Sequence, residues 1–231
     1  MGEFESVQNL EIAGRRCALA GDPEGKVLLL QLTDARELED LAEEAEHIRR
    51  LCGGASFLLA ACCVEDWNDE LSPWPAPAVF GKQGFGGHAA ATLGFVTAEL
   101  LPALEKRYPA ASGRRVIGGY SLAGLFALWA ACETDAFDAV AAASPSVWYP
   151  GWLDYAWEHP IRAGRVYLSL GDAEERARNP ALARVGDAVR ELHRMLSGSV
   201  DCTLEWNPGN HFRDAPLRTA KGFAAVLNSA G

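Results

Sequence analysis

One serine of this chain lies in a segment where its hydroxyl could act as a nucleophile. The segment 119–124 reads Gly-Tyr-Ser-Leu-Ala-Gly; a short apolar run, 115–117, precedes it and a longer one, 125–130, follows it. This order of strand, sharp turn and helix predicts a nucleophile elbow, which projects the hydroxyl of Ser121 from the carboxyl end of a strand. The usual pattern is Gly-x-Ser-x-Gly, and Ala123 takes its fifth position here. The alternative is a glycine-rich turn whose serine only caps the helix.

A serine hydroxyl becomes a strong nucleophile only when a base takes its proton, and that base is usually a histidine. In one common chain order the serine comes first, the acid second and the histidine last. Among the five histidines, only His211 follows the last predicted strand, on an Asn-Pro-Gly-Asn turn before the final helix. His211 is therefore the predicted base. The other interpretation is a turn histidine that bonds to the backbone.

The acid that orients the histidine should follow the strand predicted at 166–170. Three carboxylates stand there, on Asp172, Glu174 and Glu175. Such an acid commonly lies three residues after the glycine that ends the strand, which selects Glu174. The other two remain candidates, and helix capping or surface charge accounts for those that do not serve.

An ester or amide carbonyl under attack by serine also needs two backbone N–H groups to stabilise its oxyanion. The amide of Leu122, next after the nucleophile, is the first predicted donor. The second is expected in the loop after the strand at 26–32, at Thr33 or Asp34.

The elements that must position these residues alternate between strand-like and helix-like patterns. This alternation predicts an α/β fold with a mostly parallel central sheet, helices on both faces and no separate cap, in one domain spanning 1–231. An early hairpin joins 10–12 to 17–20, and later strands are expected at 26–32, 56–64, 115–117, 136–144, 166–170 and 200–206. Helices are expected at 36–52, 89–107 (kinked or restarted at Pro102), 180–196 and 216–227.

Two connections, 65–88 and 145–163, are long, and long loops of compact folds often bind ligands. Trp67, Trp74 and Trp148 stand in them, and they are the predicted wall of a substrate pocket. Alternatively, they brace the loops on the core. Such walls would suit a small acyl ester or an aromatic ester.

Composition excludes several classes of function. The chain has 231 residues and a formal net charge of −10, so nucleic acid and anionic membranes are not expected as partners. No signal peptide or spanning segment is visible, and the six cysteines show no zinc spacing. The expectations are a cytoplasmic location, reduced thiols and no metal.

Three segments, 118–128, 166–175 and 206–212, together resemble the putative-esterase branch of the α/β hydrolases. That branch includes esterase-D-like enzymes, feruloyl and acetyl esterases, and siderophore esterases. The resemblance implies an α/β-hydrolase fold, a catalytic triad of Ser121, Glu174 and His211, and ester hydrolysis without metal or organic cofactor.

The leading hypothesis is therefore a serine carboxylesterase that cleaves a small-molecule ester through an acyl-enzyme intermediate. Two alternatives use the same residues, namely acyl transfer to an acceptor other than water and peptide cleavage. A third is a non-catalytic binding module on a hydrolase fold.

Overall fold

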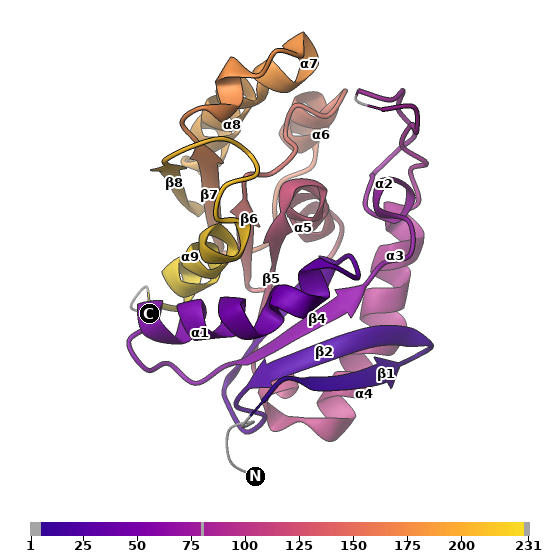
Figure 1. The fold of residues 1–231 in the computed structure, drawn as a ribbon, viewed down its shortest axis with the longest axis vertical. Coiled ribbons are helices and arrows are strands. Elements are labelled where there is room, and N and C mark those ends of the chain that lie inside the picture. Colours follow the sequence, from indigo (N-terminus) through magenta and orange to yellow (C-terminus); the bar gives the residue numbers. More distant parts are fainter. Residues whose placement is uncertain (1–5, 80, 229–231) are drawn as a thin grey trace.

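A single twisted sheet runs through the part of the chain that the computed structural model describes, residues 6–79 and 81–228 (Figure 1). Within those residues the sheet has eight strands in the order β1-β2-β4-β3-β5-β6-β7-β8. The strands are β1 (Gln8–Ile12), β2 (Arg15–Gly21), β3 (Val27–Thr33), β4 (Leu58–Cys63), β5 (Arg114–Tyr120), β6 (Ala139–Ala143), β7 (Arg165–Gly171) and β8 (Asp201–Asn207).

The strands from β3 to β8 pair in parallel, and β2 alone runs in the opposite direction, antiparallel to both of its neighbours, β1 and β4. Parallel strands are buried on both faces, which explains their nearly continuous apolar sequences. Their carboxyl ends all meet at one edge of the sheet. The predicted functional residues follow β3, β5, β7 and β8, so the topology brings them to this edge.

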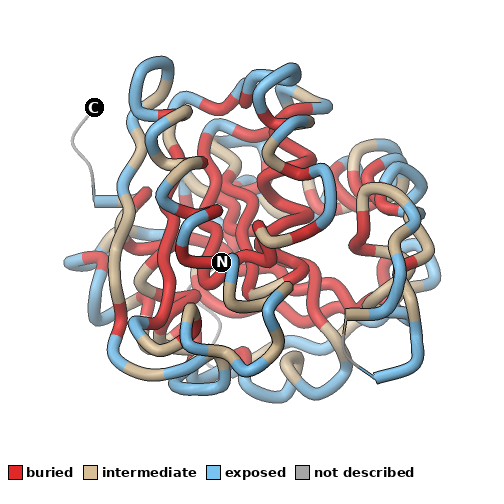
Figure 2. The backbone as a smooth tube through the Cα atoms, turned by 90° about the horizontal axis from the view of Figure 1, so that it is seen from above, coloured by how far each residue is buried: buried red, intermediate tan, exposed pale blue. Residues whose placement is uncertain are grey.

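Helices cover both faces of the sheet, as predicted (Figure 1). They are α1 (Leu41–Leu51), α2 (Trp67–Glu70), α3 (Ala89–Phe95), α4 (Leu101–Arg107), α5 (Ser121–Glu133), α6 (Trp152–Glu158), α7 (Pro180–Ala183), α8 (Val185–Leu196) and α9 (Ala215–Asn228). On one face α1 and α9 pack side by side around Ile48 and Phe223. The other face carries α3, α4, α5 and α8. Figure 2 shows buried chain through the centre of the molecule and exposed chain around it.

The helix after the predicted elbow is buried on all sides. Every residue of α5 from Leu122 to Cys132 is buried. A helix that is apolar all round needs such a position in the core. This burial fixes the start of α5, and with it Ser121, rigidly against the sheet.

The helix expected at 89–107 is continuous, but its middle is not α-helical. A π-helical turn, Val96–Leu100, joins α3 to α4, and Pro102 lies in the first turn of α4. A proline lacks the N–H group that a regular helix would use there, and a wider turn accommodates this loss. The helix expected at 180–196 is also divided, into α7 and α8.

Two short helices, α2 and α6, lie inside the long connections and were not predicted. A helix of one or two turns is too short to show a clear periodicity, so the sequence gives no such signal. The side chain of Asp66 caps α2 by accepting a hydrogen bond from the amide of Asp69. None of the helices in the described ranges is long and apolar enough to cross a bilayer.

Candidate active site

Ser121 lies at the turn between β5 and α5 in a backbone conformation that is strained for a serine. Its φ is +57°, in the left-handed region that non-glycine residues rarely adopt. Such strain persists only where the surroundings enforce it, and it is concentrated at functional sites. A Cβ atom on Gly119 would lie 2.7 Å from the Cβ of Ala123, so the turn requires a glycine there. The tight turn of an elbow is therefore present although Ala123 replaces the usual glycine.

A chain of two hydrogen bonds connects Ser121 to a buried carboxylate. The Nε2 atom of His211 lies 3.0 Å from the Oγ of Ser121, and its Nδ1 lies 2.7 Å from the Oε2 of Glu174. His211 comes from the loop after β8, and Glu174 begins the 3-10 turn after β7. Residues from three separated segments thus meet at the carboxyl edge of the sheet. The arrangement can move a proton from the hydroxyl to the imidazole.

Glu174 is ionised in spite of its burial. Only 4% of its side chain is exposed, and burial alone would raise its pKa. The hydrogen bond and charge of His211, the amide of Gly171 and the hydroxyl of Ser144 outweigh burial, so the pKa of Glu174 lies below its ordinary value. An ionised acid can hold the imidazole in the tautomer that accepts the serine proton.

The two competing carboxylates have other partners. Asp172 accepts a hydrogen bond from the amide of Gly209 at 2.8 Å, and Glu175 pairs with Arg190 at 2.8 Å. The remaining histidines also have partners away from Ser121. They are His47 with Glu43, His88 with Asp69, His159 with Tyr155, and His193 with the carbonyl of Cys202.

Sequence analysis missed three polar residues around Glu174, namely Tyr120, Ser144 and Arg218. Ser144 and Arg218 donate to the Oε1 of Glu174 at 2.8 and 3.1 Å. Tyr120 donates to the backbone oxygen of His211 at 2.8 Å. The sequence carries no signal for Arg218 beyond its place in the helix predicted at 216–227.

A cavity of about 570 Å³ opens beside Ser121. Its walls are largely apolar, which suits an organic ligand. They include Trp67, Phe85, Trp148, Leu182 and Val185.

Two of the three tryptophans predicted to wall the pocket lie at the cavity, and the third does not. Trp67 and Trp148 line the cavity, and Trp74 does not. The indole of Trp74 donates to the carbonyl of Pro150 at 2.8 Å and packs against Tyr149 and Tyr155. Trp74 therefore braces the two long connections on each other, whereas the alternative interpretation had the tryptophans brace these loops on the core.

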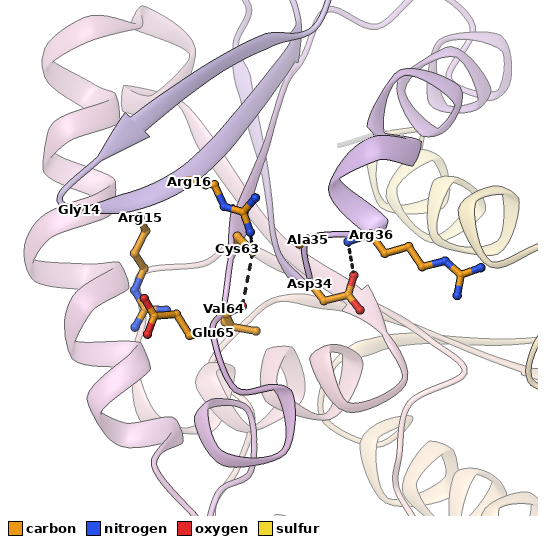
Figure 3. Close-up of a pocket in the computed structure, with 9 residues that line it drawn as sticks. All are labelled: Gly14, Arg15, Arg16, Asp34, Ala35, Arg36, Cys63, Val64 and Glu65. Carbon is orange, nitrogen blue, oxygen red and sulfur yellow. Dashed lines mark hydrogen bonds between the residues drawn. The ribbon is translucent and has the colours of Figure 1, made fainter.

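Of the predicted oxyanion donors, one lies at the cavity and two do not. Leu122 lines the cavity beside Ser121, and neither Thr33 nor Asp34 is among its lining residues. The side chain of Asp34 accepts from the amide of Arg36 at 2.8 Å and lines a separate cavity (Figure 3). The register pairs Gln31 of β3 with Gly118 of β5, so the backbone after β3 still leads toward the Ser121 turn. A second donor from Thr33 or Asp34 remains a prediction.

Within residues 6–79 and 81–228, no group of three histidine, cysteine or acidic side chains is arranged to hold a metal ion. The six cysteines, all within those ranges, form no disulfide bonds.

Residues 24–201 match the protein family described as "Putative esterase". The chain belongs to this family. It is accordingly an ester hydrolase on the α/β-hydrolase fold. The matched region includes Ser121 and Glu174 and ends before His211.

Solved structures show the same fold at low sequence identity. An IroE-like serine hydrolase from Shewanella oneidensis has a TM-score of 0.80 and 16% identity, over 96% of this chain and 80% of its own. The siderophore hydrolase EstA from Aspergillus nidulans has a TM-score of 0.75 and 20% identity, over 99% of this chain and 98% of its own. A ferulic acid esterase has a TM-score of 0.65 and 16% identity, over 98% and 95%. No curated protein matches the chain in sequence.

Proposed function

We propose that the chain is a serine carboxylesterase that uses Ser121 as nucleophile, His211 as general base and Glu174 as the orienting acid. The observation that carries this proposal is the hydrogen-bond chain of 3.0 and 2.7 Å through His211. The strained turn at Ser121 supports it independently, because an ordinary helix cap does not need a positive φ.

In the first half of the reaction the Oγ of Ser121 attacks the ester carbonyl carbon, and its proton passes to the Nε2 of His211. The carbonyl oxygen becomes an oxyanion, which the amide of Leu122 at the start of α5 stabilises. His211 then gives the proton to the leaving alkoxide oxygen, and the C–O bond breaks. The products are an alcohol and an acyl-Ser121 ester.

In the second half a water molecule attacks the acyl carbon. His211 takes a proton from this water and returns it to the Oγ of Ser121 as the acyl–enzyme bond breaks. Throughout, Glu174 stays ionised and stabilises the imidazolium that forms twice in the cycle.

The cavity walls favour an ester with an apolar acyl or aryl group. Trp67 and Trp148 face a space large enough for an aromatic ring, and Leu182 and Val185 add aliphatic surface. A siderophore hydrolase and a ferulic acid esterase have the same fold, and the name of the second agrees with an aromatic substrate. The proposed location remains the cytoplasm.

The proposal is tested with p-nitrophenyl acetate and a fluorophosphonate probe. Ser121→Ala should abolish both hydrolysis and labelling, while the parent protein should carry one adduct, on Ser121. Unchanged hydrolysis by Ser121→Ala would reject this nucleophile. A parent protein that neither hydrolyses any member of an ester panel nor takes the label would be a binding module.

A further inference from the structure

Arg218 is a buried cation beside the proposed triad, and the chemistry described above does not use it. Its side chain is 2% exposed, and it lies on α9, at the sheet face opposite to α5. Burying a guanidinium is costly unless its donors are satisfied. Four acceptors surround this one: Glu174 at 3.1 Å, Tyr120 at 3.1 Å, Ser144 at 3.3 Å and the carbonyl of Pro208 at 2.9 Å.

These acceptors lie on the segments that carry the triad. Tyr120 immediately precedes Ser121. Its hydroxyl accepts from Arg218 and donates to the backbone oxygen of His211 at 2.8 Å. Pro208 begins the loop that bears His211. One planar group thus holds the nucleophile turn, the acid and the base loop in a fixed relation, which suits the rigid fork of an arginine.

The two carboxylate oxygens of Glu174 have different hydrogen-bond partners. Oε1 accepts from Arg218, Ser144 and the amide of Gly171, which leaves Oε2 for His211. A Cβ on Gly171 would come within 2.9 Å of Oε1 and 3.0 Å of the guanidinium, so the pair is packed directly against the backbone. The carboxylate therefore cannot rotate away from the imidazole without breaking three hydrogen bonds.

We propose that Arg218 is a positioning residue that aims Glu174 at His211. The positive charge of Arg218 lies on the far side of the carboxylate from His211. It therefore holds the Oε1 atom of the carboxylate and leaves Oε2 directed at the imidazole. This inference rests on the proposed function of the same site.

The test compares Arg218→Gln and Arg218→Lys with Lys221→Gln, a matched control that removes a paired cation from the same helix. We expect Arg218→Gln to lower kcat for p-nitrophenyl acetate about a hundredfold, the cost of a misplacement of roughly 1 Å, with KM within about twofold.

Arg218→Lys retains the charge and should keep KM close to that of the parent protein. Its kcat should recover only in part, because an ammonium group cannot reach all four acceptors. Lys221→Gln should match the parent in both kcat and KM. The inference is overturned if Arg218→Gln keeps the kcat of the parent protein, or if Lys221→Gln lowers kcat equally.

If Arg218→Gln does not fold, Tyr120→Phe in the parent and in Arg218→Lys gives a second measurement. Coupled residues should show non-additive losses in kcat, and strictly additive losses would overturn the inference. Ser121→Ala separates the two proposals. A fully active Ser121→Ala rejects the proposed function itself, whereas an inactive Ser121→Ala with a parent-like Arg218→Gln rejects only the role of Arg218.

Discussion

At the scale of single residues, the three carboxylates after β7 have three different partners and should differ in their effects. Glu174→Gln keeps the shape of the side chain but cannot hold His211 in the required tautomer. We expect kcat for p-nitrophenyl acetate to fall by about 10³-fold or more. Asp172→Asn and Glu175→Gln should stay within about twofold of the parent, because their partners are Gly209 and Arg190. An unchanged rate in Glu174→Gln would contradict the assignment.

Gly119 tests the steric requirement of the elbow. The added Cβ of Gly119→Ala would lie 2.7 Å from the Cβ of Ala123 and 3.0 Å from its backbone carbon. Overpacking of this kind should destabilise the fold by about 1–3 kcal/mol, measured by urea unfolding. Gly94→Ala is the control: it lies in α3 with nothing within 4 Å of the new atom, and it should be neutral or slightly stabilising. Equal stability of the two variants would contradict the steric argument.

The sequence predicted the residues whose spacing follows from local geometry. Ser121 could be found because a strand–turn–helix pattern surrounds it, and His211 because the chain order leaves one histidine after the last strand. Glu174 was selected from the sequence by its position three residues after Gly171, with Asp172 and Glu175 left as candidates. Only the fold shows that Glu174 alone of the three contacts His211. Arg218 escaped because its partners lie on segments distant in sequence.

At the scale of elements, α1 packs on β3 through a buried acid. The Oε2 atom of Glu44 accepts from the side-chain Nε2 of Gln31 at 3.0 Å, and its Oε1 has no hydrogen-bond partner within the described residues. Burial raises the pKa of Glu44 to about 8, and the charges of Glu37 and Asp40 act in the same direction. The ordinary value is 4.5, so the folded protein binds an extra proton between these two pH values. The stability of the fold should therefore fall as the pH rises through this window.

Glu44→Gln removes this titration. We expect the free energy of unfolding of the variant, relative to the parent, to increase by a few kcal/mol (order of magnitude) between pH 5 and pH 8. Glu43→Gln, on the exposed face of the same helix with 67% of its side chain exposed, should follow the parent. Parallel curves for Glu44→Gln and the parent across that range would contradict the linkage.

Element prediction succeeded where patterns were long. The buried strands and the amphipathic helices at 36–52 and 180–196 could be read from periodicity, apart from a 3-10 turn at the start of the first and the break between α7 and α8. The wall of the cavity was harder, because α2 and α6 are too short for a periodic signal. The bracing role of Trp74 depends on contacts between two connections that the sequence cannot pair.

At the scale of the whole molecule, the net charge of −10 should repel anionic esters. Raising the ionic strength from about 0.01 M to about 0.15 M shortens the screening length from roughly 30 Å to roughly 8 Å. We expect kcat/KM for a p-nitrophenyl ester with a free carboxylate to rise with salt, and that for p-nitrophenyl butyrate to stay constant. A decrease for the anionic ester would instead reveal a local positive field from the exposed Arg176 beside the cavity.

The position of Arg218 in the chain has a consequence for biosynthesis. Ser121, Glu174 and His211 all precede α9 in the chain, so synthesis completes the three residues of the proposed triad before the helix that carries the guanidinium. Until α9 docks on the sheet, the proposed nucleophile should be poorly active. Full ester cleavage would then require this docking.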